Sequence, residues 1–124
     1  MTLTALLDHT ALIALYRANS FLTGLYIEAS RGGGRVLVPS LSVLAAERQA
    51  AGAGKHAASL RFAENVPFTA AHAVDAMDWT NVEWPVAHAA AIAWHAVREG
   101  TPLTVLSLAP ELYAGTGITP LDPA

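Results

Sequence analysis

One carboxylate stands where many α/β proteins carry out chemistry. Asp8 directly follows the apolar run Leu3–Leu7, and beyond it the apolar spacing becomes helical. Ligands of open α/β sheets bind just outside the carboxyl ends of the strands, so Asp8 is a candidate site residue. The same position also allows a purely structural role, because an acid there can cap the following helix without any ligand.

Positive charge gathers in the middle of an otherwise acidic chain. The formal net charge is −3, yet residues 31–61 hold five bases and one acid, while the residues from 62 onward hold one base and seven acids. A basic segment of this kind can face phosphate groups, although ordinary solvated helix faces would give the same pattern. The candidates for nucleic-acid contacts are Arg35, Arg48, Lys55 and Arg61.

Other familiar motifs and segments are excluded. The segment Gly52–Lys55 lacks the earlier glycine of a phosphate-binding loop, and His56 stands where that loop requires Ser or Thr. The chain has no cysteine, which rules out disulfides and thiolate metal sites. No uninterrupted run of about 18 apolar residues predicts a membrane span, and the N-terminal apolar run has no basic residue before it, as a secretory signal would. We therefore expect a cytoplasmic protein.

The candidate residues would be positioned by strands that alternate with helices. Short apolar runs predict strands at 3–7, 36–38 and 103–106, with a last edge strand at 118–121. Helical spacing, caps and breakers predict helices at 11–18, 21–30, 41–51, 56–64, 70–79, 85–98 and 110–114. This alternation predicts an α/β fold, a three-layer α/β/α sandwich around a central parallel sheet. The 124 residues fit one domain, 1–124.

The helix expected at 70–79 has two dissimilar sides. Its apolar stripe, which includes Val74 and Met77, predicts the buried side, while His72 and Asp75 lie opposite and predict a solvated contact. In the next helix His88 falls on one stripe with His95, which predicts that His88 lines a groove or a helix–helix contact. Hydrophobic residues make up 53% of the chain and charged residues 14%. This balance favours a homodimer or a partner that covers an apolar face.

Several stretches together resemble the PIN domain, a small α/β/α nuclease fold common among the toxins of bacterial toxin–antitoxin pairs. These stretches are Leu7–Ile13, Val36–Pro39 with the following helix that carries Glu47, the alanine-rich Val86–Ala91, and Val105–Tyr113. The resemblance covers nearly the whole chain. Active members of the family hold Mg²⁺ or Mn²⁺ with three or four carboxylates, and the metal activates a water for attack on a phosphodiester.

The resemblance implies specific roles for a few residues. Asp8 and Glu47 match the first and second acids, which are catalytic and hold the metal, and Thr10 matches the small hydroxyl residue behind the first acid. The third and fourth acids are missing, because no Asp or Glu lies between Glu83 and Glu99 or between Glu99 and Glu111. Two carboxylates hold and orient a metal ion less well than four.

Three functions are therefore open. The first is a weak or altered Mg²⁺- or Mn²⁺-dependent ribonuclease that acts as the toxin of a toxin–antitoxin pair. The second is a PIN-like module that has lost catalysis and binds RNA or a protein partner such as an antitoxin. In the third, the imidazole of His88 joins Asp8 and Glu47 and shifts the preference toward Zn²⁺ or Mn²⁺.

Overall fold

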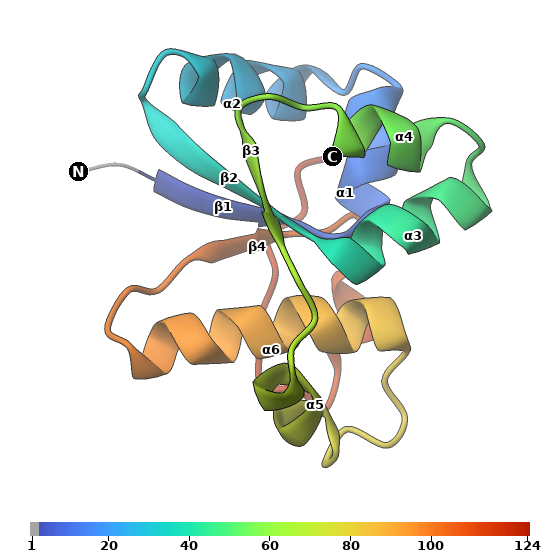
Figure 1. Ribbon diagram of the computed structural model, residues 1–124, viewed down its shortest axis with the longest axis vertical. Coiled ribbons are helices and arrows are strands. Elements are labelled where there is room, and N and C mark those ends of the chain that lie inside the picture. The colour runs from blue at the N-terminus through green and yellow to red at the C-terminus, as the bar shows by residue number, and fades with distance from the viewer. Residues whose placement is uncertain (1–2) are drawn as a thin grey trace.

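A four-stranded sheet lies between two layers of helices in the computed structural model, which describes residues 3–124 (Figure 1). The strands are β1 (Leu3–Leu7), β2 (Gly34–Pro39), β3 (Ala63–Val66) and β4 (Thr104–Leu106). They lie in the order β3-β2-β1-β4, and every neighbouring pair is parallel. The predicted three-layer α/β/α class is confirmed.

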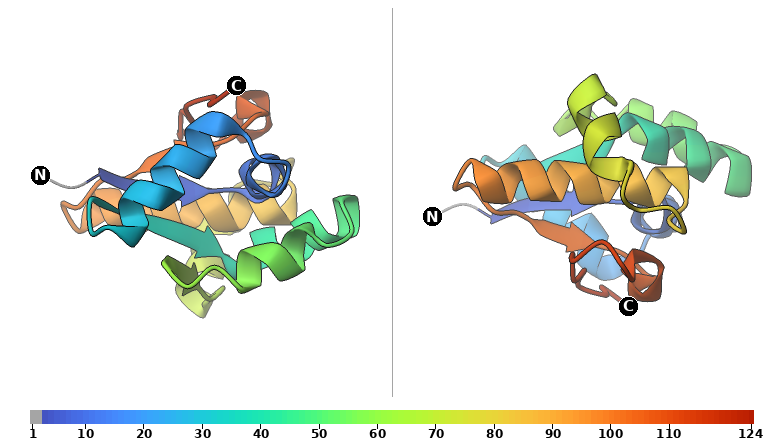
Figure 2. Two further views of the ribbon diagram at one scale, coloured as in Figure 1. Left: turned by 90° about the horizontal axis from the view of Figure 1, so that it is seen from above. Right: turned by 90° about the horizontal axis from the view of Figure 1, so that it is seen from below.

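The helices form two unequal layers. They are α1 (His9–Tyr16), α2 (Ser20–Ser30), α3 (Ser40–Gln49), α4 (Ala53–Ala58), α5 (Ala70–Ala76) and α6 (Trp84–Arg98), with a 3₁₀-helix η1 (Pro110–Tyr113) near the C-terminus. The helices α1, α2 and α4 cover one face of the sheet, while α6 covers the other and carries α5 on its outer side (Figure 1). Helix α6 runs alongside β1 (Figure 2), and α3 contacts both layers. No helix within residues 3–124 is long and apolar enough to cross a membrane.

The alternation of side chains along β1 creates two cores. Ala5 and Leu7 point to the layer of α1 to α4, while Leu6 points to α6. The alanine-rich helix α6 packs on the sheet and buries Val86 and Ile92 against it. Because these strands are parallel, the carboxyl ends of β1, β2 and β4 meet at one edge of the sheet, where Asp8 lies.

Two predicted elements are only partly confirmed. The helix expected at 56–64 ends at Ala58, and the segment Ala63–Val66 is instead the edge strand β3. Its central residues Glu64 and Asn65 are exposed, so it has no apolar pattern, and pairing with β2 defines it. The edge strand expected at 118–121 is reduced to a single parallel bridge between Leu106 and Leu121.

The predicted orientation of α5 is also wrong. Its apolar residues face outward, with Val74 60% and Met77 70% exposed, while His72 is only 6% exposed. The polar side of the helix packs on α6 because His72 and Asp75 find partners there, which the hydrophobic pattern of α5 alone does not reveal.

Candidate functional site

Asp8 is a fully buried helix cap. It follows β1 directly, is the N-cap residue of α1 and is 0% exposed. Its Oδ1 accepts hydrogen bonds from the backbone N–H of Ala11 (3.0 Å) and the hydroxyl of Thr10 (2.6 Å), and its Oδ2 accepts one from the hydroxyl of Tyr113 (2.8 Å). No cation pairs with it among residues 3–124. Thr10 thus supports the carboxylate that caps α1.

Tyr113 closes this site from the far end of the chain. It lies at the end of η1, is buried, and its hydroxyl points at a residue 105 positions earlier in the sequence. Burial, followed by the neighbouring Asp8, raises the pKa of Tyr113 far above its usual value. The hydroxyl therefore keeps its proton and serves as a neutral donor. Sequence reasoning missed this role, because no local pattern links a C-terminal tyrosine to the end of β1.

A second hydroxyl pair ties the loop after β4 to α1. The Oγ atoms of Thr10 and Ser107 lie 3.3 Å apart, and Ser107 is the donor because Thr10 gives its proton to Asp8. Thr10 Oγ1 also accepts from the N–H of Leu108 (2.9 Å), and Ser107 Oγ accepts from that of Ala109 (3.1 Å). The hydroxyl of Ser107 thus fastens the loop after β4 to α1.

Glu47 also has a structural task. Its Oε2 accepts from the N–H of Gly52 (2.8 Å) and its Oε1 from that of Lys55 (3.0 Å), so it caps the start of α4. These two hydrogen bonds, first from Gly52 and then from Lys55, lower the pKa of Glu47. Helix α4 comes this close because Gly54 has no side chain: a Cβ there would lie 2.5 Å from the carbonyl oxygen of Val43.

As arranged, the two acids do not fit a hydrated metal ion. A Mg²⁺ ligand must offer a carboxylate oxygen toward the ion and its waters. The oxygens of Asp8 are enclosed by Thr10 and Tyr113, and both oxygens of Glu47 accept from the backbone of α4. Within residues 3–124 no three His, Asp or Glu side chains are grouped so that they could hold a metal. The metal-ligand roles of Asp8 and Glu47 stay predictions from the resemblance.

His88 lies in a helix–helix contact, as its stripe on α6 predicted. It is fully buried, its ring centroid is 5.1 Å from that of Phe68 and 5.0 Å from that of His72, and its Nδ1 accepts weakly from the N–H of Leu41 (3.4 Å). Burial, and then His72, lower the pKa of His88 to about 4. Its neighbours are thus the α5 segment and the start of α3, and we assign it no role as a metal ligand.

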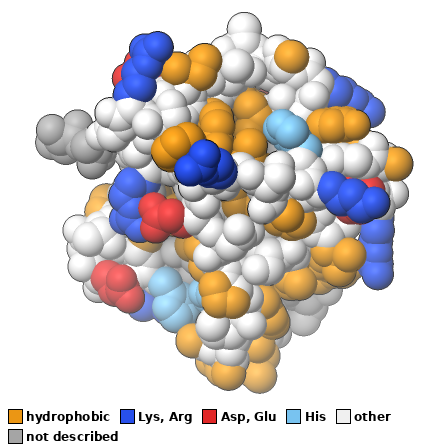
Figure 3. All heavy atoms as spheres, turned by 45° about the horizontal axis from the view of Figure 1, so that its top comes forward, with side chains coloured by type: hydrophobic (Ala, Val, Ile, Leu, Met, Phe, Trp, Pro, Cys, Tyr) orange, Lys and Arg blue, Asp and Glu red, His pale blue; other side chains and the backbone are white. Residues whose placement is uncertain are grey.

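The four basic candidates differ in their surroundings. Arg35 forms a two-pronged ion pair with Glu64 (2.8 and 2.9 Å), so its charge is already matched. Arg48, Lys55 and Arg61 form no ion pair with any described residue. The guanidinium of Arg48 lies 5.9 Å from the ring centroid of Trp84. On the face drawn in Figure 3 the basic side chains stand apart among apolar ones instead of forming one patch.

An open groove of about 420 Å³ adjoins the buried carboxylate at the end of α1. Its wall consists of Thr10, Ile13, Ala14, Arg17, Asn19, Gln49 and Leu108. Apolar carbon dominates this wall, Arg17 is its charged residue, and no carboxylate of the described chain contributes to it. Thr10 links the two features, since it lines the groove and also donates to Asp8.

No protein-family model, curated protein or solved structure matches this chain at a significant level. The chain has a three-layer α/β fold, a strand-end acid enclosed in a hydrogen-bond network, and an apolar groove beside that acid.

Proposed function

We propose that this chain is a PIN-like domain that has lost metal-dependent RNA cleavage and works as a protein-binding module. The observation that carries the proposal is the enclosure of Asp8. Metal-dependent hydrolysis needs an acid that presents an oxygen to the metal and its water. Here the corresponding oxygens accept from the hydroxyls of Thr10 and Tyr113 and from the backbone of α1. Asp8 stabilises the fold through these hydrogen bonds and does not present an oxygen to a metal ion.

The groove beside Asp8 supports a protein as the partner. Its apolar wall suits aliphatic or aromatic side chains, whereas RNA binding usually relies on clustered cations. Arg17 lies at its rim, is exposed and has no ion-pair partner among the described residues. We expect the bound segment to be short and apolar and to carry an acidic residue opposite Arg17. An antitoxin or another regulatory protein would supply such a segment.

A displayed library of random 16-residue peptides tests this assignment. The wild-type protein should enrich apolar peptides that contain Asp or Glu, and Arg17→Glu should weaken their binding at least about tenfold, the effect of losing roughly 1.4 kcal/mol. Arg31→Glu is the matched control, because Arg17 and Arg31 are both exposed C-cap residues, of α1 and α2. Equal binding by the two variants, or no enrichment at all, would contradict the proposed groove.

Single-stranded RNA is the second candidate partner. The observation that favours it is the pair of Arg48 and Trp84, because an exposed aromatic ring beside a free guanidinium can stack on a base. The net charge of −3 and the separation of the basic residues disfavour it. Binding of a labelled oligouridine that Arg48→Gln weakens would shift the assignment from protein to RNA.

The assembly state and location stay predictions of the sequence. Homodimerisation is expected from the low charge content. Apolar residues that are exposed in the single chain, such as Phe21 and Trp84, could be covered by a second copy. A cytoplasmic location is expected from the absence of cysteine.

A further inference from the structure

Helix α5 is attached to the protein by its polar side. His72 is its buried residue, while Val74 and Met77 point to solvent. Short helices are normally held by an apolar face, so the attachment of α5 depends unusually strongly on polar and titratable contacts. Those contacts come from the imidazole of His72 and the carboxylate of Asp75.

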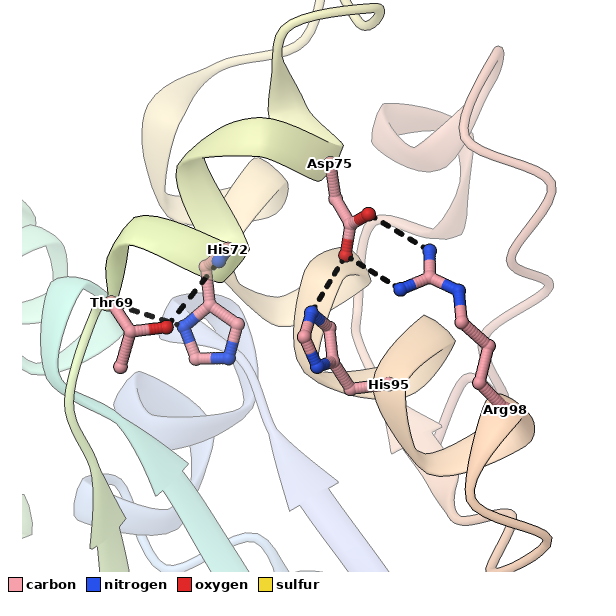
Figure 4. Close-up of polar contacts among 5 residues, drawn as sticks. All are labelled: Thr69, His72, Asp75, His95 and Arg98. Atoms are coloured by element: carbon pink, nitrogen blue, oxygen red, sulfur yellow. Dashed lines mark hydrogen bonds and ion pairs between the residues drawn. The ribbon is translucent and has the colours of Figure 1, made fainter.

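His72 performs two tasks at once. Its Nδ1 accepts from the N–H of Thr69 (3.1 Å), and its own N–H donates to the hydroxyl of Thr69 (3.3 Å), which together form a capping box (Figure 4). Its ring also lies between two imidazoles of α6, with centroids 5.0 Å from His88 and 5.1 Å from His95. Three imidazoles therefore meet at the contact of α5 with α6.

Asp75 provides the ionic part of the contact. Its Oδ2 lies 2.8 Å from Nε2 of His95, and its two oxygens accept from the guanidinium of Arg98 at 2.8 and 3.2 Å (Figure 4). Arg98 is the main cause that lowers the pKa of Asp75. The carboxylate thus stays ionised through the weakly acidic range, and its charge is already matched by Arg98.

We propose that α5 is an acid-released clasp: it is docked on α6 while His72 is neutral and detaches when His72 is protonated. A proton on His72 would place a positive charge beside His88 and His95 in a partly buried contact. The other charged groups around this contact are Asp75 and Arg98, together with Arg35, Glu64 and Glu99, which share a cavity of about 350 Å³ with His72 and His95. Asp75 favours the charged form of His72, but its carboxylate is already paired with Arg98, and Glu64 is paired with Arg35. The exposed Glu99 is the remaining carboxylate of this cavity.

The sign of the pH effect follows from the two buried imidazoles. Burial, and then His95, lower the pKa of His72, and burial lowers that of His88 to about 4. When α5 detaches and water reaches the rings, their pKa values return toward 6.5. The docked state is thus fully favoured above pH 6.5 and weakens as the pH falls below it.

Hydrogen exchange of the full chain, followed by mass spectrometry at pH 7.5 and pH 5.5, tests the clasp. After correction for intrinsic rates, protection of residues 70–76 should fall at least about fivefold more than that of β1. His72→Gln should remove much of this difference, because a glutamine at the third position of the capping box can replace the Nδ1 contact but does not titrate. His56→Gln on α4 is the matched control and should leave the pH dependence of α5 unchanged.

Three results would overturn the clasp. Protection of α5 could fall no more than that of β1 in the wild type, which needs no variant to fold. It could fall equally in the wild type and in His72→Gln. The pH dependence of α5 protection could also change as much in His56→Gln as in His72→Gln. The proposed loss of catalysis does not enter this experiment, so the two proposals fail independently.

Discussion

Replacement of Asp8 by alanine is expected to lower the free energy of unfolding by about 3 kcal/mol. The substitution removes the N-cap of α1 and leaves the hydroxyl of Tyr113 buried without an acceptor. It also leaves the hydroxyl of Thr10 without the carboxylate that accepts its proton. Chemical denaturation of the wild type and the variant measures the difference directly.

The sign of this change distinguishes a structural acid from a ligand. Carboxylates kept for metal binding commonly weaken a fold, so their removal is neutral or stabilising. Asp78→Ala is the matched control, because Asp78 is exposed and forms no hydrogen bond or ion pair within residues 3–124. It should change stability by less than about 0.5 kcal/mol. An Asp8→Ala protein as stable as the wild type would show that the network carries little energy.

Substitution of Gly54 by alanine is expected to cost about 2 kcal/mol or more. The new Cβ would lie 2.5 Å from the carbonyl oxygen of Val43 and 2.6 Å from Cβ of Glu47, and both neighbours belong to the rigid helix α3. The two helices would have to separate, which also pulls Glu47 away from the backbone of α4. Denaturation curves report the cost, and hydrogen exchange of residues 53–58 reports the loss of the cap.

Gly24→Ala provides the control for this prediction. Gly24 lies inside α2 and a Cβ there meets nothing within 4 Å. Because alanine has the better helix propensity, this variant should be more stable by about 0.5 to 1 kcal/mol. Equal effects of the two substitutions would mean that the close approach of α3 and α4 does not limit position 54.

The sequence was informative where one short stretch decides the structure. The run Leu3–Leu7 was predicted to be a strand, and β1 has those bounds. The expectation that Asp8 follows the end of a strand, and the alternative that it caps the next helix, both depend only on neighbouring residues. The alternation of strands and helices likewise predicted the parallel sheet.

The rest could not be predicted because it depends on contacts between distant segments. β3 has polar residues at its centre and exists because β2 offers an edge to pair with. The orientation of α5 follows from partners on α6, which outweigh the apolar side of α5 itself. The enclosure of Asp8 depends on Tyr113, and only the folded path of the last twenty residues brings that hydroxyl to β1.

Calorimetric titration of the protein with Mn²⁺ tests the central claim that Asp8 is a structural cap and not a metal ligand. We expect no saturable binding with a Kd below about 1 mM, for the wild type and for Asp8→Asn alike. Asparagine is the suitable variant, because its carbonyl oxygen can still cap α1 while the charge that a metal needs is gone. Saturable binding by the wild type that Asp8→Asn abolishes would instead show that Asp8 is a metal ligand at this edge of the sheet.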